Sequence, residues 1–551
     1  MFPKFDEYME ILNWIRKNKL LFLVLAAYAV SMISVINWGI PNLSHPFTYH
    51  MDEWHQLQAV RTTFRNFSAN VPGSAHGTMF HFILSGLYLI PFFLLKIINP
   101  FILKSSLDQL QMQQRLFEIL RLNTIIFGLL SIFFIAKIAK DYLKVNLVLV
   151  ATLFAVTPLW ISLSNYFKYD IALTFWIILS VFFLLKFGTK PTLKNYLIAG
   201  IFCSIAVATK ISALPLFIIY LFSYFWFTKR KTRKLKDIFL GALVFTAVLI
   251  PLGFPDLVLG KGDYSEFLYS NLVIGPETFS NLITGFSSWW AYLLIKIFPI
   301  DFGYSFFIVY VVAALYWLVI LSKYILIKRL AVLKFEVFLL FSLILFLISL
   351  IPLGIGANGN RLLVLLPYFA ILSALFLRNI QKSGIRYKSL LSALLTIGIA
   401  IQIFQSAITI YAKLVPDVRQ ISSQWMRDNV SKNTLIGLEN IPIYQMLPDI
   451  VLMDFYSKDK SSSYRQNYKY QIVDASTKML PSVVIVTNKE LELNYFKNSP
   501  KKLLVERLTR EKYKQLVEFK PSAGIYLFAE NYLNFYLSGL APIPTISIFG
   551  K

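Results

Sequence analysis

Two adjacent carboxylates, Asp52 and Glu53, lie at the centre of a polar stretch that follows the first long apolar run. A carboxylate in a partly dry pocket can take a proton from a hydroxyl group as a general base, and it can also bind a metal ion. Because adjacent side chains seldom point the same way, we expect one reactive group and one supporting group. The alternative is that both residues simply favour the first turn of an amphipathic helix over 53–67, where backbone amides attract negative charge.

The five histidines of the chain lie in or just after the same stretch, at His45, His50, His55, His76 and His81. His50, Glu53 and His55 do not have the spacing of the helical zinc motif, in which two histidines four residues apart flank a glutamate. We therefore expect that no metal cofactor is required and that His55 contacts a bound substrate. A divalent metal ion held by His50 and His55 is the alternative.

Three further charged residues, Asp170, Lys210 and Arg361, lie at the edges of apolar runs. Ionisable groups in such places are costly to embed, and they indicate a functional site when they face a cavity. Lys210 and Arg361 together would suit an anionic group such as a lipid phosphate. The alternatives are that Asp170 is solvated at the interface, with Lys168 as its partner, and that the two cations extend to the surface.

The elements that position these residues follow from a strongly apolar composition. Hydrophobic residues make up 57% of the 551 residues, charged residues make up 15%, and the mean hydropathy is +0.61. Recurring runs of about 20 apolar residues are typical of a polytopic membrane protein. The net charge of +25 lies mostly in short clusters between these runs, as in cytoplasmic loops that face anionic lipid. We therefore expect membrane lipid, and no nucleic acid, as a partner. The single cysteine excludes an intrachain disulfide.

The distribution of Lys and Arg predicts the orientation of the chain. The basic residues from Lys4 to Lys19 place the N-terminus in the cytoplasm, so a first span over 20–38 delivers the acidic stretch to the outer face. If the apolar segment 79–103 also crossed, the basic clusters between it and residue 236 would all face outward. We therefore expect this segment to lie in the outer leaflet, or to enter the membrane and return to the same side. The eleven expected spans are 20–38, 119–139, 145–164, 169–187, 193–209, 211–228, 236–254, 303–327, 333–355, 361–379 and 389–411.

The predicted fold is an all-α polytopic membrane domain over 1–411, with outer-leaflet juxtamembrane helices and a C-terminal α/β extracytoplasmic domain. The membrane domain includes an outer loop over 39–118, which carries Asp52 and Glu53, and a second outer loop over 254–302.

The C-terminal domain, residues 412–551, is expected because the spans end there and helical and β-like segments alternate. The pattern predicts an amphipathic helix over 418–427 and buried strands over 482–487 and 524–528.

The order of these features resembles a known superfamily, the C-type membrane glycosyltransferases, and within it the protein O-mannosyltransferase and aminoarabinose-transferase-like group. The features that carry the resemblance are Asp52-Glu53 in the first outer loop, Arg121-Leu-Asn123 opening a span, the outer Asp170, Lys210 at a helix junction and Arg361-Leu-Leu-Val-Leu-Leu-Pro367. The C-terminal domain, with Asp417-Val-Arg419 near its start, is similar to that of many prokaryotic members.

The resemblance implies that Asp52 is the catalytic base with Glu53 supporting it, that Asp170 is a second acidic group, and that Lys210 and Arg361 hold the donor phosphate. It also implies a polyprenyl-phosphate-linked sugar as donor and transfer with inversion on the extracytoplasmic face. We expect the prokaryotic plasma membrane as the location. The acceptor, which is a protein, lipid or glycan hydroxyl, stays open.

The chemistry agrees with this assignment, because cations alone can stabilise a phosphate leaving group, and only the acceptor hydroxyl needs a base. A glycosidase would instead need two carboxylates that flank the sugar. The alternative function is a membrane transporter or flippase for a lipid-linked or anionic substrate. The sequence lacks the paired, Gly/Pro-interrupted spans and visible inverted repeats that are typical of transporters.

Overall fold

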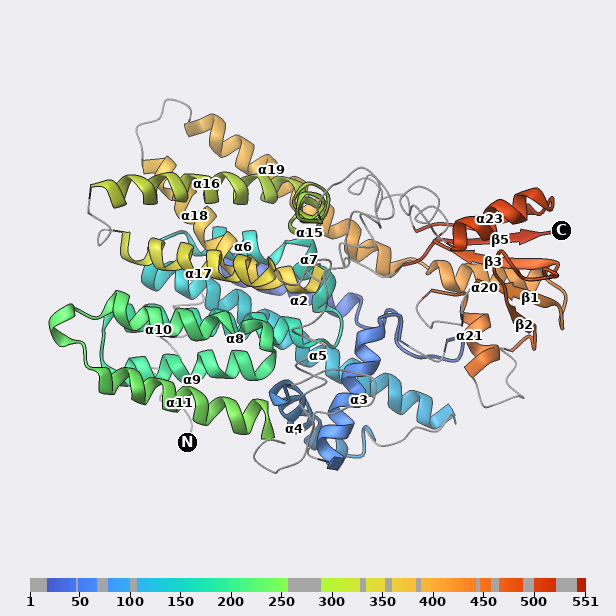
Figure 1. Ribbon diagram of the computed structural model, residues 1–551, viewed down its shortest axis with the longest axis horizontal. Coiled ribbons are helices and arrows are strands. Elements are labelled where there is room, and N and C mark those ends of the chain that lie inside the picture. Colours follow the sequence, from blue (N-terminus) through green and yellow to red (C-terminus); the bar gives the residue numbers. More distant parts are fainter. Residues whose placement is uncertain are drawn as a thin grey trace.

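The computed structural model describes residues 17–45, 48–66, 78–99, 107–255, 289–327, 333–351, 359–382, 388–439, 441, 446–456, 465–488, 500–521 and 543–551. Most of these residues form helices, which pack into an elongated bundle (Figure 1). The helices of the bundle are α2 (Lys19–Ser34), α5 (Leu107–Ile138), α6 (Leu147–Ala155), α7 (Pro158–Ser164), α8 (Tyr169–Thr189), α9 (Leu193–Thr209), α10 (Pro215–Phe227), α11 (Leu235–Gly253), α15 (Phe298–Phe302), α16 (Tyr304–Leu326), α17 (Lys334–Leu350), α18 (Leu366–Lys382) and α19 (Lys388–Leu414). In an apolar surrounding a helix satisfies its backbone amides internally, which explains why these apolar runs fold this way.

Within the described residues, six helices are long and apolar enough to cross a membrane, or seven if the bent pair of α6 and α7 counts as one span. These helices coincide with seven of the expected spans. The shorter apolar helices α2, α9 and α10 coincide with three more, and α17 covers most of the remaining one. The structure is therefore a mostly helical, membrane-type fold, and the number of eleven crossings stays a prediction.

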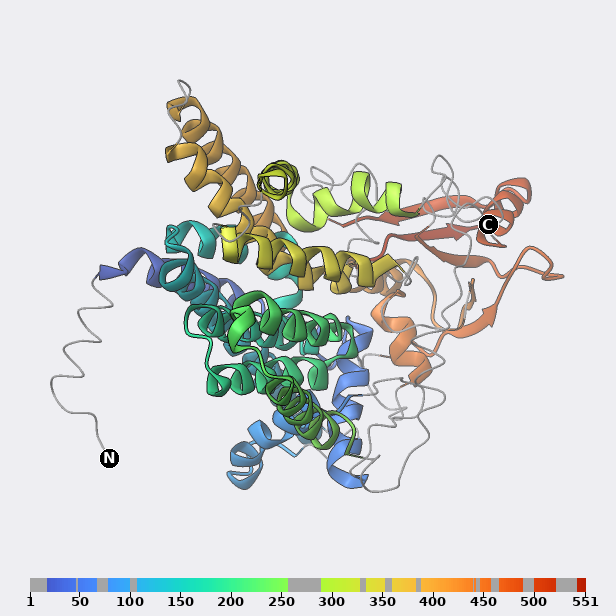
Figure 2. The ribbon, with the colours of Figure 1, turned by 60° about the vertical axis from the view of Figure 1, so that its left-hand side comes forward.

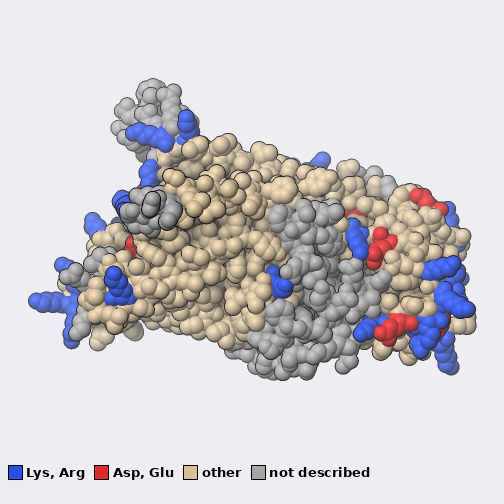
Figure 3. Space-filling view, turned by 90° about the horizontal axis from the view of Figure 1, so that it is seen from above, with Lys and Arg blue, Asp and Glu red and all other residues tan. Residues whose placement is uncertain are grey.

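The surface of the bundle is apolar where its outer helices are exposed. The most apolar part of α8 is 83% buried, whereas the corresponding windows of α11 and α16 are only 11% and 22% buried. On α16 the exposed side chains include Ile308, Leu315 and Val319. Figure 3 shows few charged side chains on the described surface between the two ends of the molecule. A helix that is apolar on its exposed face is expected to contact lipid.

Basic side chains hold helices together at one end of the bundle. Lys334 Nζ donates to the carbonyl of Gly188 at 2.6 Å, and Arg378 Nη1 donates to the carbonyl of Leu143 at 2.5 Å. Lys334 and Arg378, which belong to two of the clusters that the charge distribution assigns to the cytoplasm, thus lie at the end of α8 opposite to Asp170. Their cytoplasmic location stays a prediction.

The other end carries α3 (Met51–Asn66) and α4 (Phe80–Leu94), and Figure 1 shows α3 running across the ends of the bundle helices. The helix expected over 53–67 is therefore confirmed. At ~1.5 Å per residue, the 15 residues of α4 extend about 22 Å, which is shorter than ~30 Å of hydrocarbon. That segment 79–103 does not cross stays a prediction.

The helix α5 begins at Leu107, well before the span expected over 119–139. Its early turns carry Leu116 and Leu120, which form a small core with Leu57 of α3 and Phe82 of α4. The span expected over 119–139 falls almost entirely within this helix, and the residues before the apolar run continue the same helix and pack on α3 and α4.

Among its described residues, the C-terminal part contains a five-stranded mixed sheet with the strand order β2-β1-β3-β5-β4. Its strands are β1 (Leu435–Leu438), β2 (Lys469–Ile472), β3 (Val483–Thr487), β4 (Lys514–Phe519) and β5 (Ile546–Gly550). Strand β1 pairs in parallel with β2 and β3, and β5 pairs antiparallel with β3 and β4. The helices α20 (Val418–Asn429), α21 (Asp449–Tyr456) and α23 (Pro500–Arg510) accompany the sheet. Figures 1 and 2 place the sheet at the end of the molecule where α3 lies.

Two local predictions for this part are confirmed, because α20 covers the helix expected over 418–427 and β3 covers the strand expected over 482–487. The strand expected over 524–528 and most of the outer loop 254–302 lie outside the described residues. The division into domains at residue 412 stays a prediction, and α19 continues to Leu414.

Candidate active site

The carboxylate of Asp52 forms an ion pair with Lys168. Its Oδ2 lies 2.6 Å from Lys168 Nζ, and 38% of the Asp52 side chain is exposed, compared with 1% of the Lys168 side chain. Burial alone would raise the pKa of Asp52, but the ammonium of Lys168 holds that pKa below its ordinary range. Asp52 is therefore ionised at neutral pH, and part of its side chain is open to a bound molecule.

The two members of this pair come from helix N-termini that are far apart in sequence. Asp52 lies in the first turn of α3, and Lys168 is the residue before α8. The Asp52 backbone amide donates to His50 Nδ1 at 3.2 Å. Burial lowers the pKa of His50 to about 3, so its ring is neutral and Nδ1 acts as the acceptor. The imidazole of His50 thus caps the helix that presents Asp52.

Asp170 connects Lys168 with Lys210. Its Oδ1 lies 2.8 Å from Lys210 Nζ, and its Oδ2 lies 3.7 Å from Lys168 Nζ. Lys210 follows the end of α9, and its Nζ lies 4.4 Å from the ring centroid of Tyr169. Asp52, Lys168, Asp170 and Lys210 therefore form one continuous row of alternating charge at this end of the bundle. The Lys210 side chain keeps 18% exposure at the end of the row.

Glu53 faces a different surrounding from Asp52. It is fully buried, and Arg121 of α5 binds both of its carboxylate oxygens, at 2.8 and 2.7 Å. The backbone amide of Phe167 also donates to Glu53 Oε1 at 2.8 Å. Arg121 in turn donates to the carbonyl of Trp38 at 2.7 Å. Glu53 thus ties α3 to α5 and to the segment that leads into α8, which is the geometry of a supporting residue.

Arg361 lies on η8 (Gly359–Leu365), which packs against α8. The first residue of α8 is Tyr169, whose ring lies against Lys210. Among the described residues the buried Nη1 of Arg361 has no hydrogen-bond partner. A buried guanidinium N–H without a partner is unfavourable, so this atom is available to an incoming acceptor.

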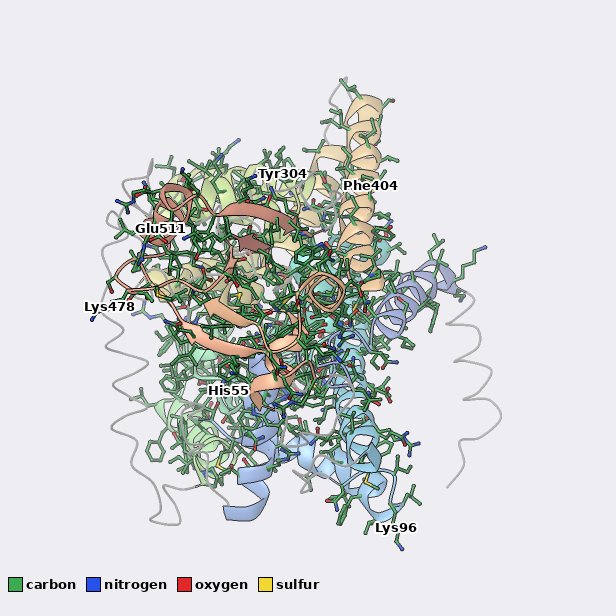
Figure 4. The ribbon with its side chains drawn as sticks, turned by 90° about the vertical axis from the view of Figure 1, so that its right-hand side faces the viewer. His55, Lys96, Tyr304, Phe404, Lys478 and Glu511 are labelled. Atoms are coloured by element: carbon green, nitrogen blue, oxygen red, sulfur yellow. The ribbon has the colours of Figure 1, made fainter. Side chains whose placement is uncertain are left out.

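His55 lies one turn after Asp52 on α3, and residues three apart on a helix share a face. Figure 4 views the molecule from the side of the C-terminal sheet and places His55 in the inner part of the picture, whereas Lys96 lies at the lower edge. In the part of the chain that the structure describes, no three His, Cys, Asp or Glu side chains are grouped as metal ligands. The expectations for His55 and for the cofactor stay predictions.

Two residues of this site were not recognised from the sequence. Lys168 was expected only as a partner of Asp170, yet its shortest ion pair is with Asp52. Arg121 was part of the resemblance but had no assigned role. Lys168 could have been found in the same way as Lys210, because it is also a cation at the edge of an apolar run. The partner of Arg121 is 68 residues away and cannot be inferred from local spacing.

Among the residues that the structure describes, the charges of the site do not cancel. Two carboxylates, Asp52 and Asp170, face three cations, Lys168, Lys210 and Arg361, whereas Glu53 is balanced by Arg121. One uncompensated positive charge near a partly exposed carboxylate suits a substrate that carries an anionic group beside a hydroxyl to be deprotonated.

Residues 110–254 match the family model described as dolichyl-phosphate-mannose-protein mannosyltransferase. The matched region runs from α5 through α11 and includes Lys168, Asp170 and Lys210. Asp52 and Arg361 lie outside it. This match confirms the resemblance to this group of membrane glycosyltransferases. No curated protein matches the chain.

Several solved structures match the chain at low identity. ArnT from Cupriavidus metallidurans in the apo state is 11% identical, over 96% of this chain and 97% of that chain, with a TM-score of 0.45. The Archaeoglobus fulgidus oligosaccharyltransferase tethered with an acceptor peptide is 15% identical, over 76% of this chain and 58% of that chain, with a TM-score of 0.47. The S. cerevisiae protein O-mannosyltransferase Pmt1-Pmt2 complex bound to the sugar donor is 18% identical, over 46% of this chain and 34% of that chain, with a TM-score of 0.30. The chain covers 55–59% of the length of the archaeal oligosaccharyltransferase chains, which is less than two thirds.

Proposed function

We propose that this protein is an integral-membrane glycosyltransferase that moves a sugar from a polyprenyl-phosphate donor to an acceptor hydroxyl. The observation that carries the proposal is the row Asp52–Lys168–Asp170–Lys210, together with Arg361 on η8, which packs against α8. The row combines a partly exposed carboxylate with an excess of positive charge at one end of an apolar helical bundle. The family match over 110–254 supports the class of reaction.

The donor phosphate binds at Lys210 and Arg361. Lys210 is partly exposed, and Arg361 Nη1 offers a donor that has no partner among the described residues. Charge-assisted hydrogen bonds from these cations stabilise the phosphate as negative charge develops on it in the transition state. The polyprenyl chain lies against the apolar surface of the bundle, where lipid has access.

Asp52 is the general base. The acceptor oxygen attacks the anomeric carbon from the face opposite to the phosphate, the bond between that carbon and the phosphate oxygen breaks, and its electron pair stays on the phosphate. The configuration is inverted. The acceptor hydroxyl becomes strongly acidic as it bonds to an oxocarbenium-like carbon, so Asp52 can accept its proton although the pairing with Lys168 makes this carboxylate a weak base. Glu53 supports the loop that presents Asp52.

The reaction takes place on the extracytoplasmic face of a prokaryotic plasma membrane. In this orientation the N-terminus and the basic end of the bundle face the cytoplasm, and the C-terminal sheet lies outside. No divalent metal is required for the reaction as written, because the leaving phosphate is stabilised by cationic side chains. The acceptor is a hydroxyl of a protein, a lipid or a glycan.

The test is sugar transfer by purified protein in lipid nanodiscs, with a panel of polyprenyl-phosphate-linked sugars. Asp52→Asn keeps the shape of the side chain and removes the base, so we expect transfer to fall by about 10²–10⁴-fold, with donor binding retained. Asp141→Asn, which removes an exposed carboxylate at the opposite end of the bundle, is the matched control. Full activity of Asp52→Asn would refute the proposal.

A further inference from the structure

Tyr49, three residues before Asp52, reaches the C-terminal domain. Its hydroxyl donates to Asp449 Oδ2 at 3.0 Å across 400 residues of sequence. Both side chains are buried. Among the described residues, Asp449 Oδ1 has no hydrogen-bond partner, whereas Oδ2 accepts from Tyr49. Asp449 is the first residue of α21.

The ring of Tyr49 is also in close contact with neighbouring side chains. The guanidinium carbon of Arg419 lies 3.6 Å from the ring centroid, and Arg419 is fixed by Asp417 at 2.7 and 2.8 Å. His45 stacks on the ring with centroids 4.5 Å apart. The Tyr49 amide donates to Gly39 at 2.9 Å, and a Cβ at Gly39 would lie only 2.6 Å from Tyr49 Cδ2, at a φ of +65°. This close approach explains why glycine occupies that position.

A second contact reaches the partner of Asp52. Lys413 Nζ, near the end of α19, donates to the carbonyl of Ser162 at 3.0 Å and to Asn165 Oδ1. It also lies 4.5 Å from the ring centroid of Tyr166. Asn165 is three residues before Lys168. The chain is thus held three residues before each member of the pair. Asp449 holds Tyr49 before Asp52, and Lys413 holds Asn165 before Lys168.

We infer that the C-terminal domain aligns the Asp52–Lys168 pair through Tyr49, and that Tyr49 is a positioning residue for the transfer reaction. The inference rests on the proposed function. Tyr49 does not touch the pair itself, and it acts by fixing the chain that enters α3. A displacement of a reacting group by about 1 Å can reduce a rate by about 10²-fold, so the anchoring of this loop has consequences for catalysis.

The experiment compares Tyr49→Phe and Asp449→Ala with the matched control Tyr468→Phe. Tyr468 is also buried, and its hydroxyl donates to the carbonyls of Met426 and Val430 within the C-terminal domain. We expect Tyr49→Phe and Asp449→Ala to lower kcat by about 10-fold with the donor KM nearly unchanged, and the control to keep its kcat. Asp449→Asn retains an oxygen acceptor for the Tyr49 hydroxyl and is expected to restore most of the kcat.

Two further measurements separate positioning from a merely structural role. The double variant Tyr49→Phe/Asp449→Ala should be no slower than the slower single variant, because both changes remove the same contact. Amide hydrogen exchange over 38–52 should become faster in Tyr49→Phe and stay unchanged in Tyr468→Phe. This measurement requires no substrate and is carried out on the full-length protein in nanodiscs.

The inference is overturned if Tyr49→Phe and Asp449→Ala match the control in both kcat and hydrogen exchange. If Asp52→Asn is fully active, the proposed function fails, and the exchange measurement still decides whether the C-terminal domain orders this loop. If Tyr49→Phe does not fold, Asp449→Ala with its Asp449→Asn rescue provides the same comparison.

Discussion

The carboxylates of Asp52 and Glu53 are adjacent in sequence but have different partners and different exposure. Asp52 pairs with Lys168 at 2.6 Å and remains partly open, whereas Glu53 is fully buried against Arg121 at 2.7 Å. Neighbouring residues of a helix point about 100° apart, so only one of the two can face the open side of α3. This geometry assigns exposure, and with it access to substrate, to Asp52 alone.

Replacement of Lys168 by Gln should alter the pH dependence of sugar transfer. Lys168 holds the pKa of Asp52 below its ordinary range, so without the ammonium this pKa rises. The base must be ionised, and the acid limb of the rate profile should therefore move to higher pH. The measurement is kcat against pH in nanodiscs. Lys137→Gln, which breaks an exposed pair at the other end of the bundle, should leave the profile in place.

Replacement of Arg361 should weaken donor binding. A hydrogen bond to a charged group contributes about 1.5–3 kcal/mol, so Arg361→Ala should reduce the affinity for a polyprenyl-phosphate donor by roughly 10–100-fold. Arg361→Lys should recover part of this loss, because it restores the charge but not the planar set of donors. Equilibrium binding of labelled polyprenyl phosphate measures the effect, with the exposed Arg510→Ala as control. Equal affinity in all three variants would exclude Arg361 from the phosphate site.

Replacement of Glu53 should destabilise the protein. Glu53→Gln leaves Arg121 buried without a counter-charge, which typically costs about 3–5 kcal/mol. Asp141→Asn breaks the exposed pair with Lys137 and should cost less than about 1 kcal/mol. Thermal unfolding in detergent, monitored by tryptophan fluorescence, gives the unfolding midpoints of the Glu53→Gln and Asp141→Asn variants for comparison. Equal midpoints would show that the Glu53–Arg121 pair does not hold α3 in place.

The burial of the Asp449 carboxyl should make stability depend on pH, and the hydrogen bond from Tyr49 opposes this effect in part. Burial raises the pKa of Asp449 to about 8. The nearby Asp417 also raises this pKa, whereas Arg419 and Arg427 lower it. The folded state favours the protonated carboxyl. The contribution of Asp449 to the free energy of unfolding is therefore complete below about pH 4 and is lost as the pH rises through about 8. Unfolding midpoints between pH 5 and 9 should therefore fall more steeply in the wild type than in Asp449→Asn. Parallel curves would contradict this role of Asp449.

Much of the architecture could be predicted from the sequence, because its causes are local. Apolar runs of sufficient length become helices, and the amphipathic pattern of 418–427 became α20. Charged residues at the edges of apolar runs had to lie at the ends of the bundle. For this reason Asp170 and Lys210, which are 40 residues apart, were correctly expected on one side of it.

The sequence alone therefore determined the class of fold, the two-ended distribution of charge and the positions of Asp52, Glu53, Asp170, Lys210 and Arg361 at the edges of apolar runs. Only the tertiary structure decided which residues pair. Asp52 meets Lys168 across 116 residues, Glu53 meets Arg121 across 68, and Tyr49 meets Asp449 across 400. The physical reason is that hydropathy and helical periodicity act over neighbouring residues, whereas a buried ion pair or hydrogen bond depends on the packing of whole helices, which brings together residues that share no local pattern.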